Sequence, residues 1–477
     1  MTIQFLQHTL FFPMMIHGFG FLSLSASLVL PWALTGLVQG QRITESLVRD
    51  IPQLSPVHEK QLPSRKLISQ AAPTTYYVSG DNGDDNKSGL NEANAFKRIQ
   101  RAADLTNPGD TVLIMNGLYT NLPGAGSAVS INRSGTANAW ITYKAYPGHT
   151  PRIKHNTWNG FELSGVSYIE INGIEISGDN DNTSYSYALS QQYNTSNPRT
   201  NGNCITLNGT NNPVHHINIV NNKVFNCGGG GIIALSADYV KVSNNSVFNN
   251  AWYGVYGGSG ISFLKNRNTD DNQGYKIFIT NNKVFNNQNF IPWYEFGKVS
   301  DGNGIIVDQA KDGPSGSYKG RTLIANNISY KNGGAGIVVH ASEHVDVVNN
   351  TAYANGNSQE IAQQGQVYAG FSSDVKIFNN IISAYPGQYA NNNYENVNVV
   401  YDYNLYPNGA LLRVTGTHDI IADPGFVDPS NDDFRLTITS RATNHGYYWG
   451  DLKTDYAGDP RPIANAYDMG AYEYQYK

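Results

Sequence analysis

Short stretches of alternating apolar and polar residues recur through the middle of the chain, and six of them contain an asparagine pair. Their first asparagines are separated by 23, 37, 45, 23 and 30 residues. A basic period near 23 residues is typical of one coil of a parallel β-solenoid, in which each coil buries its inward side chains against its neighbours. The copies are HINIVNNKVFNC (216–227), VKVSNNSVFNNA (240–251), IFITNNKVFNNQ (277–288), TLIANNISYKNG (322–333), VDVVNNTAYANG (345–356) and VKIFNNIISAYP (375–386).

A second apolar strand accompanies four of these copies. The strands are preceded by glycine and end at Leu235, Leu264, Asp308 and His340. Parallel crossovers are right-handed in nearly all proteins. We therefore predict an all-β fold, a single-stranded right-handed parallel β-helix (β-solenoid). The paired asparagines are expected to stack as a ladder that satisfies backbone groups at the turns.

Both ends of the predicted solenoid, residues 74–475, carry distinct patterns. In EANAFKRIQRAADL the residues Phe96, Ile99, Ala103 and Leu105 have nearly helical spacing, which predicts a short amphipathic helix capping the first coil. Near the C-terminus, DPGFVDPSNDDFRLTITSRATNHG and DMGAYEYQ are interpreted as short strands and turns that close the stack.

The first 40 residues differ from the rest. Residues 9–40 are rich in apolar side chains and contain no charge, which is typical of an export segment. The first basic residue is Arg42 and the apolar run is long, so residues 1–40 are either a signal peptide or a membrane anchor. Residues 41–73 have no clear period and form a linker. We expect an extracellular or cell-surface protein.

Composition narrows the possible classes of protein. Only 14% of the residues are charged, and the chain has 48 glycines and 31 tyrosines, which favours short strands and turns over a helical bundle. The formal net charge of −5 argues against a nucleic-acid partner. The two cysteines, Cys204 and Cys227, are interpreted as buried fillers or a free thiol rather than a disulfide framework.

The regular coil spacing is interrupted on both sides of one strand, 305–308. Two successive coils carry extra loops of 6 and 8 residues and then of 13 and 9 residues, and all four flank this strand. Solenoids extend loops where they bind a ligand, because such insertions leave the core intact. Residues 305–308 are therefore the predicted floor of a cleft. Asp301 and Asp308 bracket the strand, and Asp308 aligns with His340 one coil later, about 5 Å away.

The extra loops carry most of the remaining chemistry. Aromatic faces in a polar groove commonly stack on sugar rings. The candidate substrate-binding residues are Trp252, Tyr253, Trp293 and Tyr294. Asp270 and Asp271 lie in the turn-rich run NRNTDDNQG and are interpreted as turn formers.

Residues 74–475, with the YYVSGDNGDD, PGDTV and GFVDPSNDDFRLT segments, resemble right-handed parallel β-helix proteins of the pectate-lyase-like superfamily. Within it, the chain is most similar to polysaccharide lyase family nine. The resemblance implies Ca²⁺-assisted β-elimination on a uronic-acid polysaccharide such as pectate. In that family an aspartate cluster and one lysine define the site, whereas the SDGNG run here has Asn303 where a second acid would help.

The chemistry of β-elimination suggests roles for particular residues. Ca²⁺ can neutralise the uronate carboxylate, and its candidate ligands are Asp301, Asn303, Asp308 and Asp312. A base must then remove the C5 proton. The candidate bases are Lys298, Lys311 and His340, and Arg321 could hold a substrate carboxylate.

Two other functions remain open from the sequence. Asp301 with Asp308, or either of them with Glu343, could form the carboxyl pair of a glycoside hydrolase. Alternatively, the cleft could bind glycans without catalysis. In each case we expect a monomer whose partner is a polysaccharide, with membrane anchoring through the N-terminal segment as an alternative to release.

Overall fold

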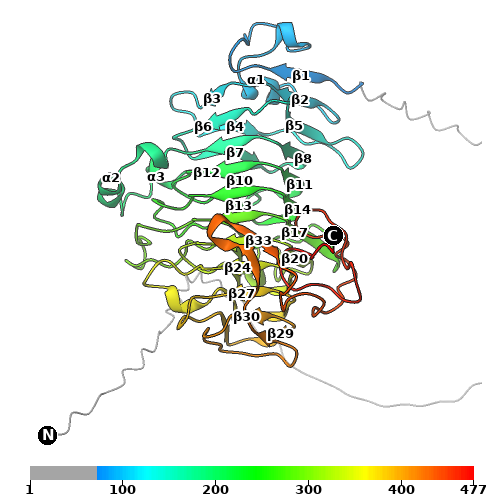
Figure 1. Ribbon diagram of the computed structural model, residues 1–477. Coiled ribbons are helices and arrows are strands. Elements are labelled where there is room, and N and C mark those ends of the chain that lie inside the picture. The colour runs from blue at the N-terminus through cyan, green and yellow to red at the C-terminus, as the bar shows by residue number, and fades with distance from the viewer. Residues whose placement is uncertain (1–71, 477) are drawn as a thin grey trace, which may run out of the picture. The chain divides into compact units, whose positions relative to one another are not determined.

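The computed structural model describes residues 72–476, so the predicted export segment and nearly all of the predicted linker lie outside the described residues. Three parallel sheets surround a common core, and successive coils add one strand to each sheet (Figure 1). The all-β parallel solenoid predicted from the sequence is confirmed. None of the helices in residues 72–476 has the length and apolar character needed to span a membrane.

Along each coil the chain forms one strand in each of the three sheets, first in sheet C, then in sheet A and then in sheet B. Sheet C contains β4 (Ser127–Ile131), β7 (Asn159–Ser164), β10 (Asn203–Asn208), β13 (Ile232–Leu235), β16 (Ile261–Leu264), β19 (Ile305–Asp308), β22 (Ile337–His340), β25 (Val367–Gly370) and β28 (Asn391–Tyr394). Sheet A contains β1 (Thr75–Val78), β2 (Thr111–Ile114), β5 (Ile141–Ala145), β8 (Ser167–Asn172), β11 (Val214–Val220), β14 (Ala237–Ser243), β17 (Tyr275–Thr280), β20 (Arg321–Ala325), β23 (Glu343–Val348), β26 (Ser373–Phe378) and β29 (Val397–Asp402).

Sheet B consists of shorter strands. It contains β3 (Leu118–Thr120), β6 (Arg152–Lys154), β9 (Glu175–Ser177), β12 (Lys223–Phe225), β15 (Ser246–Phe248), β18 (Lys283–Phe285), β21 (Ile328–Tyr330), β24 (Thr351–Tyr353), β27 (Ile381–Ser383), β30 (Leu405–Tyr406) and β31 (Ile420–Ile421). The helices are α1 (Ile99–Ala103), α2 (Tyr185–Ser190), α3 (Pro198–Asn201) and the 3₁₀ turns η1 (Glu92–Asn94), η2 (Asn180–Asn182), η3 (Ala310–Asp312), η4 (Ala362–Gln364) and η5 (Pro429–Asn431).

The four strands predicted from the glycine-led pattern end at the predicted residues. They stack in register as β13, β16, β19 and β22, so Leu235, Leu264, Asp308 and His340 form one column. Alternate residues, such as Phe263, point inward and are fully buried. Burial of each such side chain contributes about 1.5–3 kcal/mol. The stacking of coils therefore supplies the core.

The predicted asparagine ladder is confirmed for the second residue of each pair. The side-chain oxygen of Asn245 accepts the backbone N–H of Asn222 at 2.9 Å, and the Asn282 oxygen accepts that of Asn245 at 3.0 Å. The Asn245 amide nitrogen donates to the Ile219 carbonyl at 2.8 Å. The ladder thus satisfies buried backbone groups at the A–B corner, where the sheets cannot. Its members are Asn222, Asn245, Asn282, Asn327, Asn350, Asn380 and Asn404.

A second amide ladder, which the sequence interpretation missed, lies at the corner between sheets B and C. The Asn287 side-chain oxygen accepts the backbone N–H of Asn250 at 3.1 Å, and Asn332 does the same for Asn287 at 3.0 Å. Asn355 and Gln366 continue this ladder. In the coils between Asn250 and Gln366, two corners are therefore held by stacked amides.

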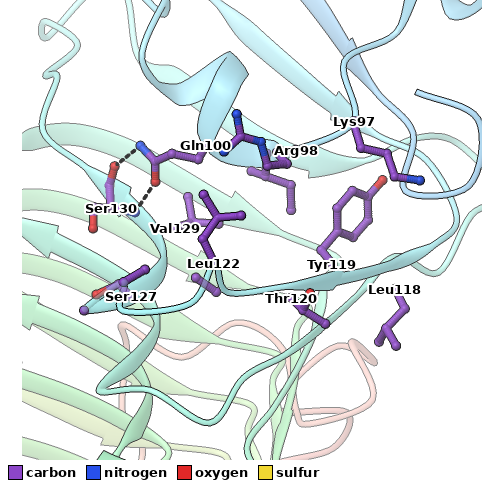
Figure 2. A pocket seen from close by; sticks show the side chains of 14 residues that line it. Lys97, Arg98, Gln100, Leu118, Tyr119, Thr120, Leu122, Ser127, Val129 and Ser130 are labelled. Atoms are coloured by element: carbon purple, nitrogen blue, oxygen red, sulfur yellow. Dashed lines mark hydrogen bonds between the residues drawn. The ribbon is translucent and has the colours of Figure 1, made fainter. Parts of the chain in front are cut away.

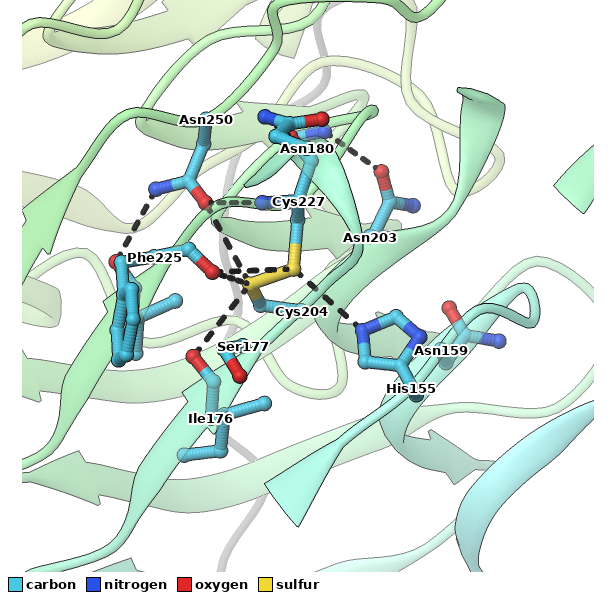
Figure 3. Close-up of a disulfide and its surroundings, with 12 residues drawn as sticks. His155, Asn159, Ile176, Ser177, Asn180, Asn203, Cys204, Phe225, Cys227 and Asn250 are labelled. Carbon is cyan, nitrogen blue, oxygen red and sulfur yellow. Dashed lines mark hydrogen bonds between the residues drawn. A yellow bond between two sulfur atoms is a disulfide. The ribbon is translucent and has the colours of Figure 1, made fainter. Parts of the chain in front are cut away.

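The interpretation of the two cysteines as fillers or a free thiol was wrong. Cys204 and Cys227 form a disulfide with a Cα–Cα distance of 5.6 Å (Figure 3). Their separation of 23 residues is one plain coil, so the chain returns beside its starting point. Closing a loop of this length stabilises the fold by about 3 kcal/mol in the chain-entropy model.

The C-terminal residues also depart from the prediction that they close the stack. After β31 the chain turns back along the side of the coils, where β32 (Phe426–Asp428) pairs with β33 (Asp433–Leu436) (Figure 1). The side chains of Asn281, Asn326 and Asn379 donate to backbone carbonyls of this returning segment, as does Asn349. These are the first members of the asparagine pairs, and their left-handed backbone makes them available to the tail.

The predicted N-terminal cap is present as α1. Its residues Ile99, Ala102 and Ala103 are buried against the first coils. Gln100 donates to the Ser130 carbonyl at 3.0 Å and accepts the Ser130 N–H at 2.7 Å, which joins the helix to β4 (Figure 2). The cap is therefore held by apolar burial and by hydrogen bonds between the Gln100 side chain and the backbone of β4.

We predict that Asn245→Ala lowers the free energy of unfolding by about 1–3 kcal/mol, because it leaves buried backbone groups of two coils unsatisfied. Denaturant unfolding measures this loss. The control is Asn244→Gly, since Asn244 is exposed and has a φ of 58°, which glycine adopts freely. Equal losses in both variants would contradict a stabilising role for the ladder.

Candidate functional site

A groove with a volume of about 510 Å³ lies on the outer face of sheet C. Its floor includes outward side chains of β13, β16 and β19, among them Ile306 and Asp308. Each of the four extra loops contributes to its lining, through Tyr256, Lys265, Trp293 and Gln309 respectively. The structure therefore places a cleft over the strand where the loop spacing predicted one.

Two aspartates of the groove come from different elements. Asp308 is the last residue of β19, and its Oδ1 lies 2.8 Å from Nδ1 of His340 on the next coil. Gln309 donates to the other oxygen at 3.3 Å. Asp301 lies in the loop before β19 and accepts a hydrogen bond of 2.7 Å from Ser300. Both carboxyl groups line the same groove.

The surroundings make the two carboxyl groups different. Burial raises the pKa of Asp301 to about 6; the nearby Asp308 charge adds to this rise, while Ser300 and His340 oppose it. Near neutral pH, Asp301 therefore takes up and releases protons readily. Adjacent carboxyl groups with different environments are the arrangement from which acid–base pairs are built.

Gly257 belongs to the wall beside Asp301. Its φ is +67°, and a Cβ placed on it would lie 2.8 Å from Oδ2 of Asp301. Any other residue there would be strained and would push against the carboxyl group. Glycine at this position thus allows the wall to pass close to Asp301.

Tyr368 lies outside the groove lining but close enough to Asp301 and Asp308 for their charges to act on it, and the sequence interpretation missed it. It lies on β25, in the column that contains Ile306 and Val338. Burial, together with the charges of Asp301 and Asp308, raises the pKa of its phenol. The phenol therefore remains protonated near neutral pH. Continuing the strand register by two coils from Ile306 would have identified it.

The predicted aromatic residues separate into two groups. Trp293 lines the groove, and so does Tyr256, which was not among the candidate substrate-binding residues. Trp252 and Tyr253 pack with the loop cluster of Ala188, Val255 and Ile291, as does Tyr294. These three side chains stabilise the wall and do not line the groove.

The predicted cationic residues are not gathered at the acid pair. Lys298 is exposed near the loop tip, and Lys311 donates to the Phe371 carbonyl at 2.8 Å. Arg321 lies on β20 of sheet A, where it pairs with Asp346 at 2.9 Å and with Asp374. Among the three candidate bases, His340 is the one that contacts an aspartate of the groove.

The four predicted calcium ligands do not converge. Asn303 is buried, and its side-chain oxygen accepts the Ala335 N–H at 2.9 Å. Its amide nitrogen donates to Asp301 at 3.2 Å, so it meets Asp301 with a donor and not with an oxygen ligand. Asp312 is exposed on η3 and does not line the groove. Asp301 and Asp308 remain as the two acidic residues that line the groove. This donor set does not fit the six or more oxygen ligands that Ca²⁺ prefers.

A buried lysine cluster near the first residues of β14 and β17 in sheet A had no signal in the sequence. Lys276 and Asp238 are both fully buried and lie 2.6 Å apart, and Asp270 is 2.9 Å from the lysine. Burial opposes the charge of Lys276, but the two aspartates outweigh it and raise its pKa. Asp238 also accepts hydrogen bonds from Tyr318 and Thr269. The cluster therefore fastens the loops 265–274 and 309–320 to the coil.

Two other features of the described residues are less suited to catalysis. A pocket of about 350 Å³ lies between α1 and the turn before β4, and its lining contains no carboxyl group (Figure 2). His155 lies close to Cys204 and Cys227, in a group with metal-like spacing. Because these sulfurs are bonded to each other, they are not available as thiolate ligands (Figure 3).

Residues 76–380 match the family described as the Pel9A-like, right handed beta helix region. The match spans more than half of the chain, so the protein belongs to this family and is a pectate-lyase-like right-handed β-helix protein. No curated protein matches the sequence.

Several solved structures are similar to this chain at low identity. A pectate lyase Pel9A structure is 17% identical, with a TM-score of 0.48 over 84% of this chain and 96% of that one. A GH136 lacto-N-biosidase from Eubacterium ramulus is 15% identical, with a TM-score of 0.48 over 73% and 68% of the two chains. A complex of XylC with xylose is 12% identical, with a TM-score of 0.45 over 83% and 98%.

We predict that ionisation of Asp301 destabilises the fold. Its folded-state pKa of about 6 exceeds the reference value of 3.8, so the folded state binds the proton more tightly than the unfolded state does. This contribution to stability is complete at low pH and declines as pH rises from about 4 to 6. The unfolding temperature of Asp301→Asn should therefore exceed that of the wild type increasingly across this range.

The control for this measurement is Asp312→Asn, which removes an exposed aspartate outside the groove. It should follow the wild-type pH dependence. A constant difference between Asp301→Asn and the wild type at all pH values would contradict the raised pKa.

Proposed function

We propose that the protein is a glycoside hydrolase in which Asp301 is the general acid and Asp308 the charged carboxylate partner. The observation that supports this most strongly is the acid pair in one groove, with the pKa of Asp301 raised to about 6. A hydrolase requires one carboxyl group that carries a proton and a second that is ionised. The half-buried position of Asp301 in the loop before β19 suits the first role.

In the proposed reaction, Asp301 donates its proton to the glycosidic oxygen as the bond to the anomeric carbon breaks. Asp308 acts on the anomeric carbon, either by activating a water molecule or by direct attack. His340 and Gln309 contact its two oxygens and hold the carboxylate in place. Each aspartate therefore has its own role, and the proposed reaction requires no metal ion.

A polysaccharide lyase is the second candidate, and family membership favours it. That reaction needs a base beside the substrate and a means of neutralising a uronate. None of the candidate bases Lys298, Lys311 and His340 lines the groove, and His340 is bonded to Asp308. The side-chain oxygen of the predicted calcium ligand Asn303 is bonded within the protein. A binding protein without catalysis would not require an acid of raised pKa. These observations favour hydrolysis.

We further propose that the protein acts outside the cytoplasm, as a monomer on a polysaccharide. The disulfide between Cys204 and Cys227 supports export, because such bonds persist in oxidising compartments. Residues 1–40, predicted to be a signal peptide or membrane anchor, would direct it there.

The hydrolase proposal predicts that Asp301→Asn and Asp308→Asn each lower kcat by about 10²–10⁴-fold, the usual contribution of acid–base catalysis. Activity should also fall as pH rises through about 6, when Asp301 loses its proton. Release of reducing ends from a panel of polysaccharides measures both effects. Asp312→Asn serves as the matched control and should keep wild-type activity.

Ultraviolet absorbance distinguishes the candidate reactions, because β-elimination creates a conjugated double bond and hydrolysis does not. We expect reducing ends without absorbance, and activity that persists in a chelator. Absorbance that grows only when calcium is present would instead identify a lyase.

A further inference from the structure

The charges of the groove restrict the kind of sugar that fits. Within residues 72–476, the charged side chains that line it are Asp301, Asp308 and Lys265. Lys265 is exposed at the rim, whereas Asp308 lies on the floor at the end of β19. A uronate placed over the acid pair would bring its carboxylate close to a like charge, which costs binding energy.

Recognition of a carboxylate normally uses arginine, whose planar group forms two parallel hydrogen bonds. Arg321 cannot supply it here, because it is paired with Asp346 and Asp374 on sheet A. Lys276 is buried with Asp238 and Asp270, and Lys311 donates to a backbone carbonyl. These three cations are thus engaged within the protein.

The rest of the groove is suited to uncharged rings. Its floor is aliphatic and includes Leu235, Leu264 and Ile306, while Trp293 and Tyr256 supply aromatic faces. The C–H face of a neutral sugar can pack on such surfaces. A carboxylate in the same position would lose its hydration without gaining a partner.

We infer that the groove binds neutral sugar units and discriminates against uronic acids at the acid pair. This inference rests on the proposed function, because it takes the acid pair as the place where the reacting sugar lies. It differs from the expectation of a pectate-like substrate, which the family resemblance implied. The chemical class of the substrate is a neutral hexose or pentose glycan.

The test compares polymers that differ only in charge. Polygalacturonate, alginate and glucuronan would each be used beside its carboxyl-reduced form, with mannan and xylan as further neutral polymers. Binding is measured by affinity electrophoresis with Asp301→Asn, which blocks the proposed acid but retains the charge of Asp308. We expect at least one neutral polymer to bind roughly tenfold or more tightly than its uronate counterpart.

Salt provides an independent readout. Weak uronate binding that is limited by repulsion should strengthen as sodium chloride is added, whereas binding through cations should weaken. Trp293→Ala should reduce the binding of neutral polymers without creating uronate binding. Its effect on folding is checked by the unfolding temperature.

Several outcomes would overturn the inference. These are tighter binding of a polyuronate than of its reduced form, uronate binding that weakens with salt, and no binding of any neutral polymer. Failure of the proposed function is a separate result. If neutral polymers bind selectively but the wild type releases no reducing ends from them, catalysis fails and the substrate class stands. If the protein instead hydrolyses a polyuronate, the proposed catalytic function stands and the inferred substrate class is wrong.

Discussion

Every coil of this protein must satisfy polar backbone groups at corners where the strands turn and sheet hydrogen bonds cannot continue. Stacked side-chain amides meet that requirement at two corners, as in the contacts between Asn222, Asn245 and Asn282. Since each amide bonds to the coil beside it, the ladders fix the height and register of the stack. The column that brings His340 beside Asp308 depends on this register.

The site uses the part of the coil that the ladders do not constrain. Extra loops leave the core strands unchanged while building walls above sheet C, and the buried pair of Lys276 and Asp238 anchors two of these loops. The result is a rigid floor with Asp308 and a loop-borne wall with Asp301. Asp301, on the loop, is the carboxyl group whose pKa is raised by desolvation. Asp308, on the strand, is held by His340 and Gln309.

Much of the architecture could be predicted because it follows from a local repeat. The spacing of asparagines and glycines identified the ends of β13, β16, β19 and β22, and the loop lengths located the groove. The roles of particular cations could not be predicted in this way. Arg321 and Lys311 are close to the acid pair in sequence, yet their partners are Asp374 and Phe371 from later coils. The disulfide was missed because cysteine number was considered without the coil period, although the separation of Cys204 and Cys227 equals one coil.

The returning C-terminal segment changes how the solenoid should behave as a chain. Simple repeat stacks have contacts between neighbours alone, so they can unravel from an exposed end, coil by coil. Here Asn281 bonds to Asp455, 174 residues away, and similar bonds reach coils further along the stack. The returning C-terminal segment therefore links coils that are not neighbours, which should make unfolding of the solenoid more cooperative. It also delays completion of the native state, because the last residues synthesised must join coils formed long before.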